Sequence, residues 1–219
     1  MNNSVILIVS ATKAECEPTL KKMTERKIIS PCLFSGSLNQ QKIELLIGGI
    51  GSVATTFNLT QTLMQRKYNR AISIGIAGSF EDEIRIGDAV QITEDCFADL
   101  GVDDNGRFIS LRQAGLDSEC DLMINPSPAS THHRQLRGIT VQTASGSMRR
   151  IDELVRRHSP KVETMENAAF FYVCRKFQIP FASFRAISNK VEPRNREKWR
   201  TEIAIERVNS LLQEELRPV

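Results

Sequence analysis

The sequence predicts an α/β fold: a single domain with a central, mixed but largely parallel twisted sheet flanked by helices. Apolar runs and amphipathic stretches alternate along the chain, as repeated strand–helix units require. Several of these runs are apolar at every position, which is typical of strands buried on both faces. Neither a repeat nor a linker interrupts the 219 residues, 41% of them hydrophobic, so residues 1–219 are expected to share one core.

Strands are expected where short apolar or β-branched runs are bounded by glycine, proline or small polar residues. These runs are residues 5–9, 29–34, 42–47, 71–74, 85–94, 139–143, 161–164 and 181–187. Gly87 is expected to bend its strand. Residues 35–39 are expected to form a turn, residues 99–105 a polar loop, and residues 117–137, which contain Asn125-Pro126-Ser127-Pro128, the least regular part of the chain.

Helices are expected where apolar side chains recur every three or four residues. These stretches are residues 13–26, 53–67, 147–158, 166–179 and 199–216. In the second stretch one face is marked by Val53, Phe57, Thr60 and Met64. Pro180 ends the fourth, because proline removes a backbone donor and clashes within a helix.

Composition and charge exclude several classes of function. The chain carries 29 basic and 26 acidic residues, a net charge of +3, and this small, dispersed excess does not indicate binding to nucleic acid. The early apolar run at residues 5–9 is too short for a signal peptide or a membrane span. The five cysteines lack C-x-x-C spacing, which favours reduced thiols and a cytoplasmic location. His132, His133 and His158 lack the spacing of zinc ligands, so no metal is expected.

Two glycine-rich segments follow predicted strands. Gly48-Gly49-Ile50-Gly51 precedes a helix, and Gly75-Ile76-Ala77-Gly78 ends the next strand. Such segments let a ligand lie against the backbone, although a tight turn or close packing explains them equally well. The first segment is neither a dinucleotide fingerprint nor a P-loop.

Three polar side chains are expected at one rim of the sheet. Glu15 follows the first strand, Glu166 opens a mostly apolar helix, and Asn189 follows a strand-like run. Ligands of open α/β sheets bind beside the carboxyl ends of strands. Glu15 and Glu166 are either carboxylates favoured by helix dipoles or groups of an active site, and Asn189 is either a turn residue or a ligand contact.

Taken together, these segments resemble the superfamily of nucleoside phosphorylases and nucleosidases over nearly the whole chain. The resemblance is carried by Ala-Thr-Lys-Ala-Glu at 11–15, Gly-Ile-Gly at 49–51, Gly-Ile-Ala-Gly at 75–78, Ile-Gly-Asp at 86–88, Met-Glu-Asn-Ala-Ala at 165–169 and Arg-Ala-Ile-Ser-Asn at 185–189. Within it the chain most resembles the futalosine hydrolases. That likeness is carried by Phe-Ala-Asp-Leu-Gly-Val at 97–102, Gly-Arg-Phe-Ile-Ser-Leu at 106–111 and Ser-Asn-Lys-Val-Glu-Pro-Arg-Asn-Arg at 188–196.

The resemblance implies hydrolysis of the N-glycosidic bond of futalosine, which releases hypoxanthine and dehypoxanthine futalosine in a route to menaquinone. Glu15 would activate the attacking water, and Glu166 would hold the ribose hydroxyls with Met165 beneath the sugar. Ala77 and Gly78 would line the nucleoside pocket, and Asn189 would face N7 and the C6 substituent of the purine. No metal or organic cofactor is implied.

Two departures from the adenosine-cleaving nucleosidases refine this expectation. Those enzymes carry an aspartate where this chain has Asn189. An asparagine donates to a 6-oxo group and accepts from N7–H of the departing base, so Asn189 favours a 6-oxopurine such as hypoxanthine. Those enzymes also carry a serine at the place of Ile76, and residues 147–150 lack their base-stacking aromatic. The side chain that covers the purine is therefore not predicted.

Alternatives remain open within the same superfamily and outside it. A nucleosidase for methylthioadenosine, S-adenosylhomocysteine or aminodeoxyfutalosine is the first; a purine nucleoside phosphorylase is the second; a nucleoside-binding protein without activity is the third. A carboxylate at Glu15 would repel phosphate and suits water.

Arg194 and Arg196 are either partners for the substrate carboxylate or solvated surface residues. The resemblance also implies a homo-oligomer, a dimer or tetramer, with the loop of Asp99 to Phe108 and Phe97 near the partner.

Overall fold

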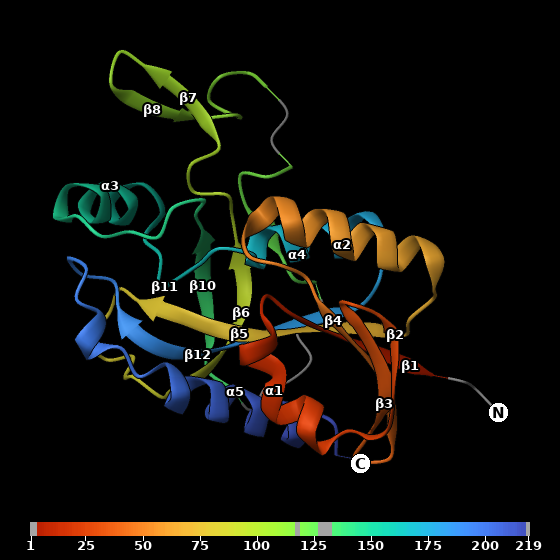
Figure 1. The fold of residues 1–219 in the computed structure, drawn as a ribbon. Helices are drawn as coiled ribbons and strands as arrows, with labels where there is room; N and C mark the ends of the chain where they lie inside the picture. Colours follow the sequence, from red (N-terminus) through yellow and green to blue (C-terminus); the bar gives the residue numbers. More distant parts are fainter. Residues whose placement is uncertain (1–3, 117–118, 127–132, 218–219) are drawn as a thin grey trace.

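The computed structural model describes residues 4–116, 119–126 and 133–217, and it has a ten-stranded mixed sheet at its centre (Figure 1). The strand order is β11-β10-β6-β12-β5-β1-β4-β3-β2, with β9 beside β6. The strands are β1 Val5–Ser10, β2 Thr24–Ser30, β3 Leu33–Leu38, β4 Gln41–Ile47, β5 Arg70–Ser79, β6 Ala89–Asp95, β9 Met123–Ile124, β10 Gln135–Thr140, β11 Val162–Thr164 and β12 Phe181–Lys190. The predicted α/β class with a mixed sheet is confirmed.

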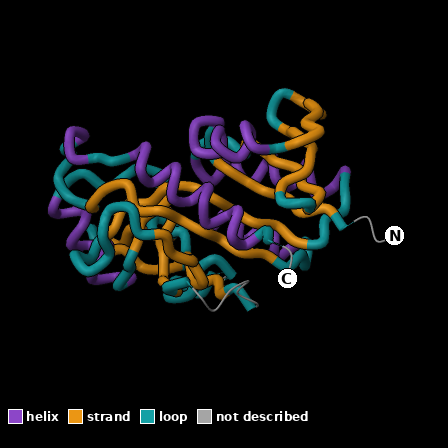
Figure 2. Tube along the Cα trace, turned by 90° about the horizontal axis from the view of Figure 1, so that it is seen from below, coloured by secondary structure: helices purple, strands orange, loops and turns teal. Residues whose placement is uncertain are grey.

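Helices cover both faces of this sheet (Figures 1 and 2). The helices are α1 Lys13–Lys22, α2 Gly51–Gln65, α3 Met148–His158, α4 Asn167–Lys176 and α5 Thr201–Glu215, with a short 3₁₀ helix, η1, at Arg196–Lys198. In Figure 1 α1 and α5 lie below the sheet, whereas α2 and α4 lie above it. Residues of β1 alternate between the two cores, because successive side chains of a strand point to opposite faces: Ile6 and Ile8 pack with α1 and α5, and Leu7 and Val9 with α2 and α4.

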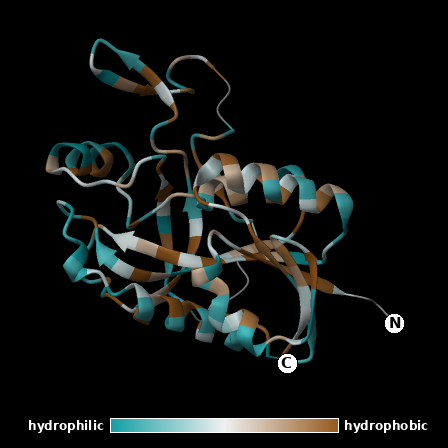
Figure 3. Ribbon diagram, viewed as in Figure 1, coloured by the Kyte–Doolittle hydropathy of each residue, from teal (hydrophilic) through white to brown (hydrophobic). Residues whose placement is uncertain are grey.

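The central strands are parallel, and their apolar character follows from burial on both sides. β1 pairs in parallel with β4 and β5, and β5 pairs in parallel with β12. In Figure 3 hydrophobic colour is strong in the sheet, and hydrophilic colour is prominent on α3. Parallel strands end at one edge of a sheet, so the loops after β1, β4 and β5 are brought together. In the described part of the chain no helix is long and apolar enough to cross a membrane.

The first half of the chain corrects several predictions. The expected strand at 29–34 is wrong: β2 and β3 form an antiparallel hairpin that turns at Pro31 and Cys32. The first helix therefore ends at Lys22, before residue 26. β2 carries exposed charged residues and lacks the apolar pattern that would have marked it. The turn expected at 35–39 is instead at Asn39 and Gln40, which have φ of 49° and 65°.

The strands around β5 also differ from prediction. Gly75-Ile76-Ala77-Gly78 does not end the strand but lies inside β5, because both β12 and β11 continue the ladder along it. The strand expected at 85–94 begins only at Ala89. Gly87 has a φ of 90°, which places it in the turn before β6.

A projecting hairpin replaces the polar loop expected at 99–105. β7 Gly101–Asp104 and β8 Arg107–Ser110 pair antiparallel and stand away from the body of the protein in Figure 1. Asn105 and Gly106 join them with φ of 53° and 83°, so the Asn-Gly dipeptide was the missed signal. The strand expected at 139–143 is also displaced, since β10 spans Gln135–Thr140. In the irregular stretch, residues 117–118 and 127–132 lie outside the described residues.

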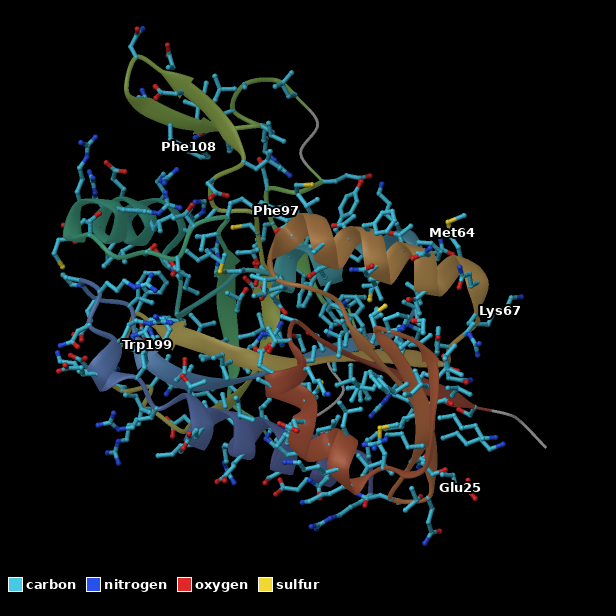
Figure 4. The ribbon with its side chains drawn as sticks, viewed as in Figure 1. Glu25, Met64, Lys67, Phe97, Phe108 and Trp199 are labelled. Carbon is cyan, nitrogen blue, oxygen red and sulfur yellow. The ribbon has the colours of Figure 1, made fainter. Side chains whose placement is uncertain are left out.

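Helix α2 exposes the face that the sequence marked as apolar. Val53, Phe57 and Met64 are exposed, and Figure 4 shows Met64 on the outer surface. The buried side chains of α2 are Ser52, Thr55, Leu59, Thr62 and Leu63. Small hydroxyl residues on the inner face hid the buried side from a hydrophobicity pattern.

Candidate active site

Three helix N-termini meet above the carboxyl ends of the central strands. α1 begins after β1, α2 begins at Gly51 after β4, and α4 begins after β11. A small pocket lies between them. It is lined by Val9, Ser10, Ala11, Glu15, Thr55, Ser73, Ile74, Gly75, Glu166 and Arg185. The structure therefore brings the two predicted carboxylates into one buried site.

Glu15 is held by the first turn of α1 and by the backbone of β5. Its Oε2 accepts bonds from the backbone N and the Oγ1 of Thr12, each at 2.9 Å, and its backbone N donates to Thr12 Oγ1 at 3.3 Å. This is a capping box, written in the sequence as Thr-x-x-Glu. Its Oε1 accepts from Ile76 N at 3.2 Å. These bonds aim a nearly buried carboxylate into the pocket.

Glu166 is the N-cap residue of α4, and its Oε1 accepts a 2.8 Å bond from Gly51 N at the start of α2. Burial raises the pKa of Glu166, while this bond and the charge of Arg185 oppose the shift. The positive ends of two helix dipoles face its carboxylate. Gly51 has a φ of 83°, a conformation that favours glycine, so the glycine segment before α2 serves Glu166.

Arg185 is the residue of this site that sequence reasoning missed. It lies on β12 and is only 3% exposed. Its positive charge interacts electrostatically with Glu166, Glu15 and Asp95. Its Nη1 donates to Ser183 Oγ at 3.1 Å and Phe184 O at 2.8 Å, and Nη2 donates to Ser73 Oγ at 3.0 Å. An arginine inside an apolar strand was itself a signal, because arginine is rarely buried without partners.

Gly75 separates the arginine from the first carboxylate. A Cβ at this position would lie 3.0 Å from Glu15 Oε1 and 3.6 Å from Arg185 Nε. Any side chain would therefore occupy the space where these two groups meet. The glycine keeps that space open for a ligand atom or water.

Ala77, Gly78 and Asn189 lie farther along the same pair of strands. Asn189 pairs with Gly78 after a register shift in β12, and a Cβ on Gly78 would be 3.2 Å from Asn189 Nδ2. Gly78 lies three positions after Gly75, which is about 10 Å of extended strand. Asn189 does not line the pocket of Glu15 and Glu166. Its Oδ1 accepts from Ser188 Oγ at 2.7 Å and its Nδ2 donates to Lys190 O at 2.8 Å.

Met165 lies next to the pocket, whereas the two predicted arginines, Arg194 and Arg196, lie outside it. Met165, next to Glu166, is partly buried and packs against the cluster that contains Ile139 and Leu154. Arg194 and Arg196 are exposed and do not line that pocket. The guanidinium carbon of Arg194 lies 5.9 Å from the ring centroid of Trp199, which Figure 4 labels. A Cβ on Gly146 would be 3.6 Å from Arg194 Cβ, so this arginine sits beside the loop before α3.

The charges in the pocket oppose an anionic nucleophile. Two carboxylates, Glu15 and Glu166, and one guanidinium, Arg185, line the pocket, so its ionised side chains carry a net negative charge. Water meets no such repulsion and finds acceptors in both glutamates. Among the residues that the structure describes, no group of three or more His, Cys, Asp or Glu is arranged to hold a metal ion.

Comparison with known proteins agrees with this fold. The model of the phosphorylase superfamily matches residues 5–217, and the chain belongs to that superfamily. The similar proteins include nucleosidases, that is, N-glycosyl hydrolases. The 5'-methylthioadenosine/S-adenosylhomocysteine nucleosidase of Haemophilus ducreyi is 29% identical over 195 residues, 83% of each chain. The futalosine hydrolase of Thermus thermophilus is 27% identical over 165 residues, 72% of this chain and 73% of that one.

Solved structures show the same fold. The 5'-methylthioadenosine/S-adenosylhomocysteine nucleosidase of Neisseria meningitidis superposes with a TM-score of 0.83 at 18% identity, covering 99% of this chain and 100% of that one. The native futalosine hydrolase of Helicobacter pylori superposes with a TM-score of 0.83 at 18% identity and 97% coverage of both chains. The two kinds of nucleosidase share this fold equally.

Proposed function

We propose that this protein hydrolyses the N-glycosidic bond of futalosine, releasing hypoxanthine and dehypoxanthine futalosine. The observation that carries the proposal is the pairing of Glu15 and Glu166 in one pocket, with Asn189 of β12 opposite Gly78, about 10 Å along β5 from Gly75. A nucleoside laid along β5 would place its ribose at the carboxylates and its base beside Gly78 and Asn189.

The chemistry of the pocket suits hydrolysis. Glu15 is the proposed general base for water, and such a base contributes roughly 10²–10⁴-fold to the rate. Glu166 is the proposed acceptor for the ribose hydroxyls. Both carboxylates stabilise the positive charge that develops on the ribosyl group as the bond breaks. Arg185 orients the two glutamates and limits their mutual repulsion.

Asn189 supports futalosine over adenosine-type substrates. Its amide offers one donor for a 6-oxo oxygen and one acceptor for N7–H of the leaving base. A 6-amino purine reverses the pattern at C6 and leaves buried polar groups unpaired. The relatives named above include both kinds of nucleosidase, so the preference for futalosine in this proposal rests on Asn189. Hydrolysis of methylthioadenosine or S-adenosylhomocysteine is the second candidate, favoured by the 29% identity to the Haemophilus ducreyi enzyme.

Assembly and location are part of the same proposal. We propose a cytoplasmic homo-oligomer in which a second copy covers the exposed apolar side chains of Val53, Phe57 and Met64 on α2. That face starts next to Gly51, which binds Glu166, so a partner there would border the pocket. Arg194 and Arg196 are proposed as partners for the substrate carboxylate on the exposed segment after Asn189.

Product analysis tests the proposed function. The protein is incubated without phosphate with futalosine, inosine and methylthioadenosine, and free hypoxanthine or adenine is measured. Hypoxanthine released fastest from futalosine supports the proposal, whereas a requirement for phosphate or a preference for methylthioadenosine contradicts it. Glu15→Gln should abolish turnover and leave nucleoside binding largely intact. Glu17→Gln is the matched control, because Glu17 lies on the same helix and is exposed.

A further inference from the structure

A continuous chain of buried side chains leads from Arg185 away from the pocket. Arg185 Nη1 donates to Ser183 Oγ at 3.1 Å, and Ser183 Oγ donates to Asn167 Oδ1 through a short bond. Asn167 Nδ2 then donates to Asp95 Oδ2 at 2.8 Å. Arg185, which lines the pocket, is 3% exposed and the other three residues are 0% exposed, so Ser183, Asn167 and Asp95 are shielded from solvent.

The direction of every bond in the chain is determined by its arginine end. A guanidinium only donates, so Ser183 Oγ accepts from Arg185 and donates its own hydroxyl proton to Asn167 Oδ1. Asn167 must therefore turn its NH₂ group to Asp95 and its oxygen to Ser183, and Ser183 must accept from the arginine. Aligned donors of this kind strengthen one another in a low dielectric.

The far end of the chain is fixed on three other elements. Thr140 Oγ1 of β10 donates to Asp95 Oδ1 at 2.9 Å, and Ala168 N of α4 donates to Thr140 Oγ1 at 2.8 Å. Asp95 itself lies on β6. A Cβ on Gly138 would come within 2.7 Å of Asp95 Oδ2, so the carboxyl group is tightly enclosed.

A purely structural role does not explain why the chain begins at the pocket. Buried polar groups satisfy one another in any core, and apolar residues in their place are often equally stable. Here the chain of Ser183, Asn167 and Asp95 orders Arg185, a cation that lines the same pocket as Glu15 and Glu166.

We propose that Asp95, Asn167 and Ser183 are positioning residues that hold Arg185 in register with Glu15 and Glu166. Their catalytic effect rests on the function proposed above, whereas their effect on the arginine does not. Ser183 acts at the near end of the chain and Asp95 at the far end, and the two are joined only through Asn167.

A double-mutant cycle on kcat tests the proposal. Ser183→Ala and Asp95→Ala each break the chain, so each should lower kcat by about 10- to 100-fold with a smaller change in KM. Once the chain is broken, the second substitution has nothing further to remove, and the double variant should be no slower than the worse single variant. Effects that multiply, or an unchanged kcat in either single variant, would overturn it.

Thr62→Val is the matched control. It removes a buried hydroxyl that donates to Asn58 O at 2.8 Å on α2, outside the pocket, and it should leave kcat unchanged. Asn167→Ala replaces Asp95→Ala in the cycle if the latter does not fold, and the same absence of additivity is expected.

A second measurement does not depend on turnover. In protein labelled with ¹⁵N-arginine, the guanidinium signals assigned by Arg185→Lys should show slow rotation and slow proton exchange. Ser183→Ala and Asp95→Ala should both remove this protection, and Thr62→Val should keep it. Protection retained in Asp95→Ala would overturn the positioning role even if futalosine is cleaved. Loss of protection in a protein that cleaves no tested nucleoside would support that role and contradict only the proposed function.

Discussion

The stability of the protein should depend on pH through Asp95, and Asp95→Asn should remove that dependence. Asp95 is 0% exposed, and burial raises its pKa from 3.8 to about 7, against the opposing effects of Asn167, Thr140 and Arg185. Between these two values the folded protein binds more protons at this site than the unfolded chain does. The contribution of the protonated Asp95 carboxyl to the free energy of unfolding is therefore fully present below about pH 4. It is lost as pH rises through about 7.

The size of the effect follows from the shift. One pKa unit corresponds to about 1.4 kcal/mol, so ionising Asp95 in the core costs roughly 4 kcal/mol in total. From about pH 5 to about pH 8 the wild-type protein should lose roughly 2–3 kcal/mol relative to Asp95→Asn. Asparagine fits the site because the Thr140 hydroxyl, which lies 3.1 Å from Thr164 Oγ1, can donate there and accept from the new amide.

Urea denaturation of both proteins at several pH values measures this difference. Protein concentration is kept fixed, because an oligomer unfolds in a concentration-dependent way. Subtracting the two free energies of unfolding cancels the titration of Glu163 and Glu166, whose pKa values burial also raises. A difference that stays constant within about 0.5 kcal/mol over this range would refute a raised pKa at Asp95.

Three further predictions concern substrate and assembly. Asn189→Asp should lower hypoxanthine release relative to adenine release, because a carboxylate cannot donate to the 6-oxo group; an unchanged ratio of the two kcat/KM values would remove the basis for the futalosine assignment. Arg194→Ala and Arg196→Ala should weaken binding of futalosine by about two- to fivefold relative to inosine, as loss of one exposed ion pair allows, and calorimetry that finds equal losses for both nucleosides would assign these arginines to the surface alone. Activity per chain should fall on dilution if a second copy borders the pocket, and a fully active monomer in sedimentation at the same concentration would argue against that partner.

Much of the fold was predictable because its central strands are written as apolar runs. β1, β4, β11, α3 and α5 were predicted close to their observed positions, since burial on both faces or one face sets a clear pattern. The hairpin of β2 and β3 was not, because edge strands carry charges that hide them from such a pattern. The β7–β8 hairpin had a readable signal in Asn105-Gly106 that a polar composition concealed.

The candidate site was predictable in its residue types and only partly in its geometry. Glu15 and Glu166 follow strand ends, and the structure places both in one pocket, as expected at the edge of a parallel sheet. Arg194 and Arg196 are close to Asn189 in sequence, but the structure leaves them exposed and outside the pocket. Proximity along the chain does not fix where a side chain points.

The amino-acid sequence alone determined the α/β class, the capping box that orients Glu15 and the choice of an amide at Asn189. These depend on local spacing and on side-chain chemistry, which a linear pattern records. Only the tertiary structure decided that Arg185 lines the same pocket as the two carboxylates and that Ser183, Asn167 and Asp95 form a hydrogen-bonded chain behind it. Those residues come from β12, α4 and β6, and their contacts exist because the sheet pairs strands that lie far apart in the chain.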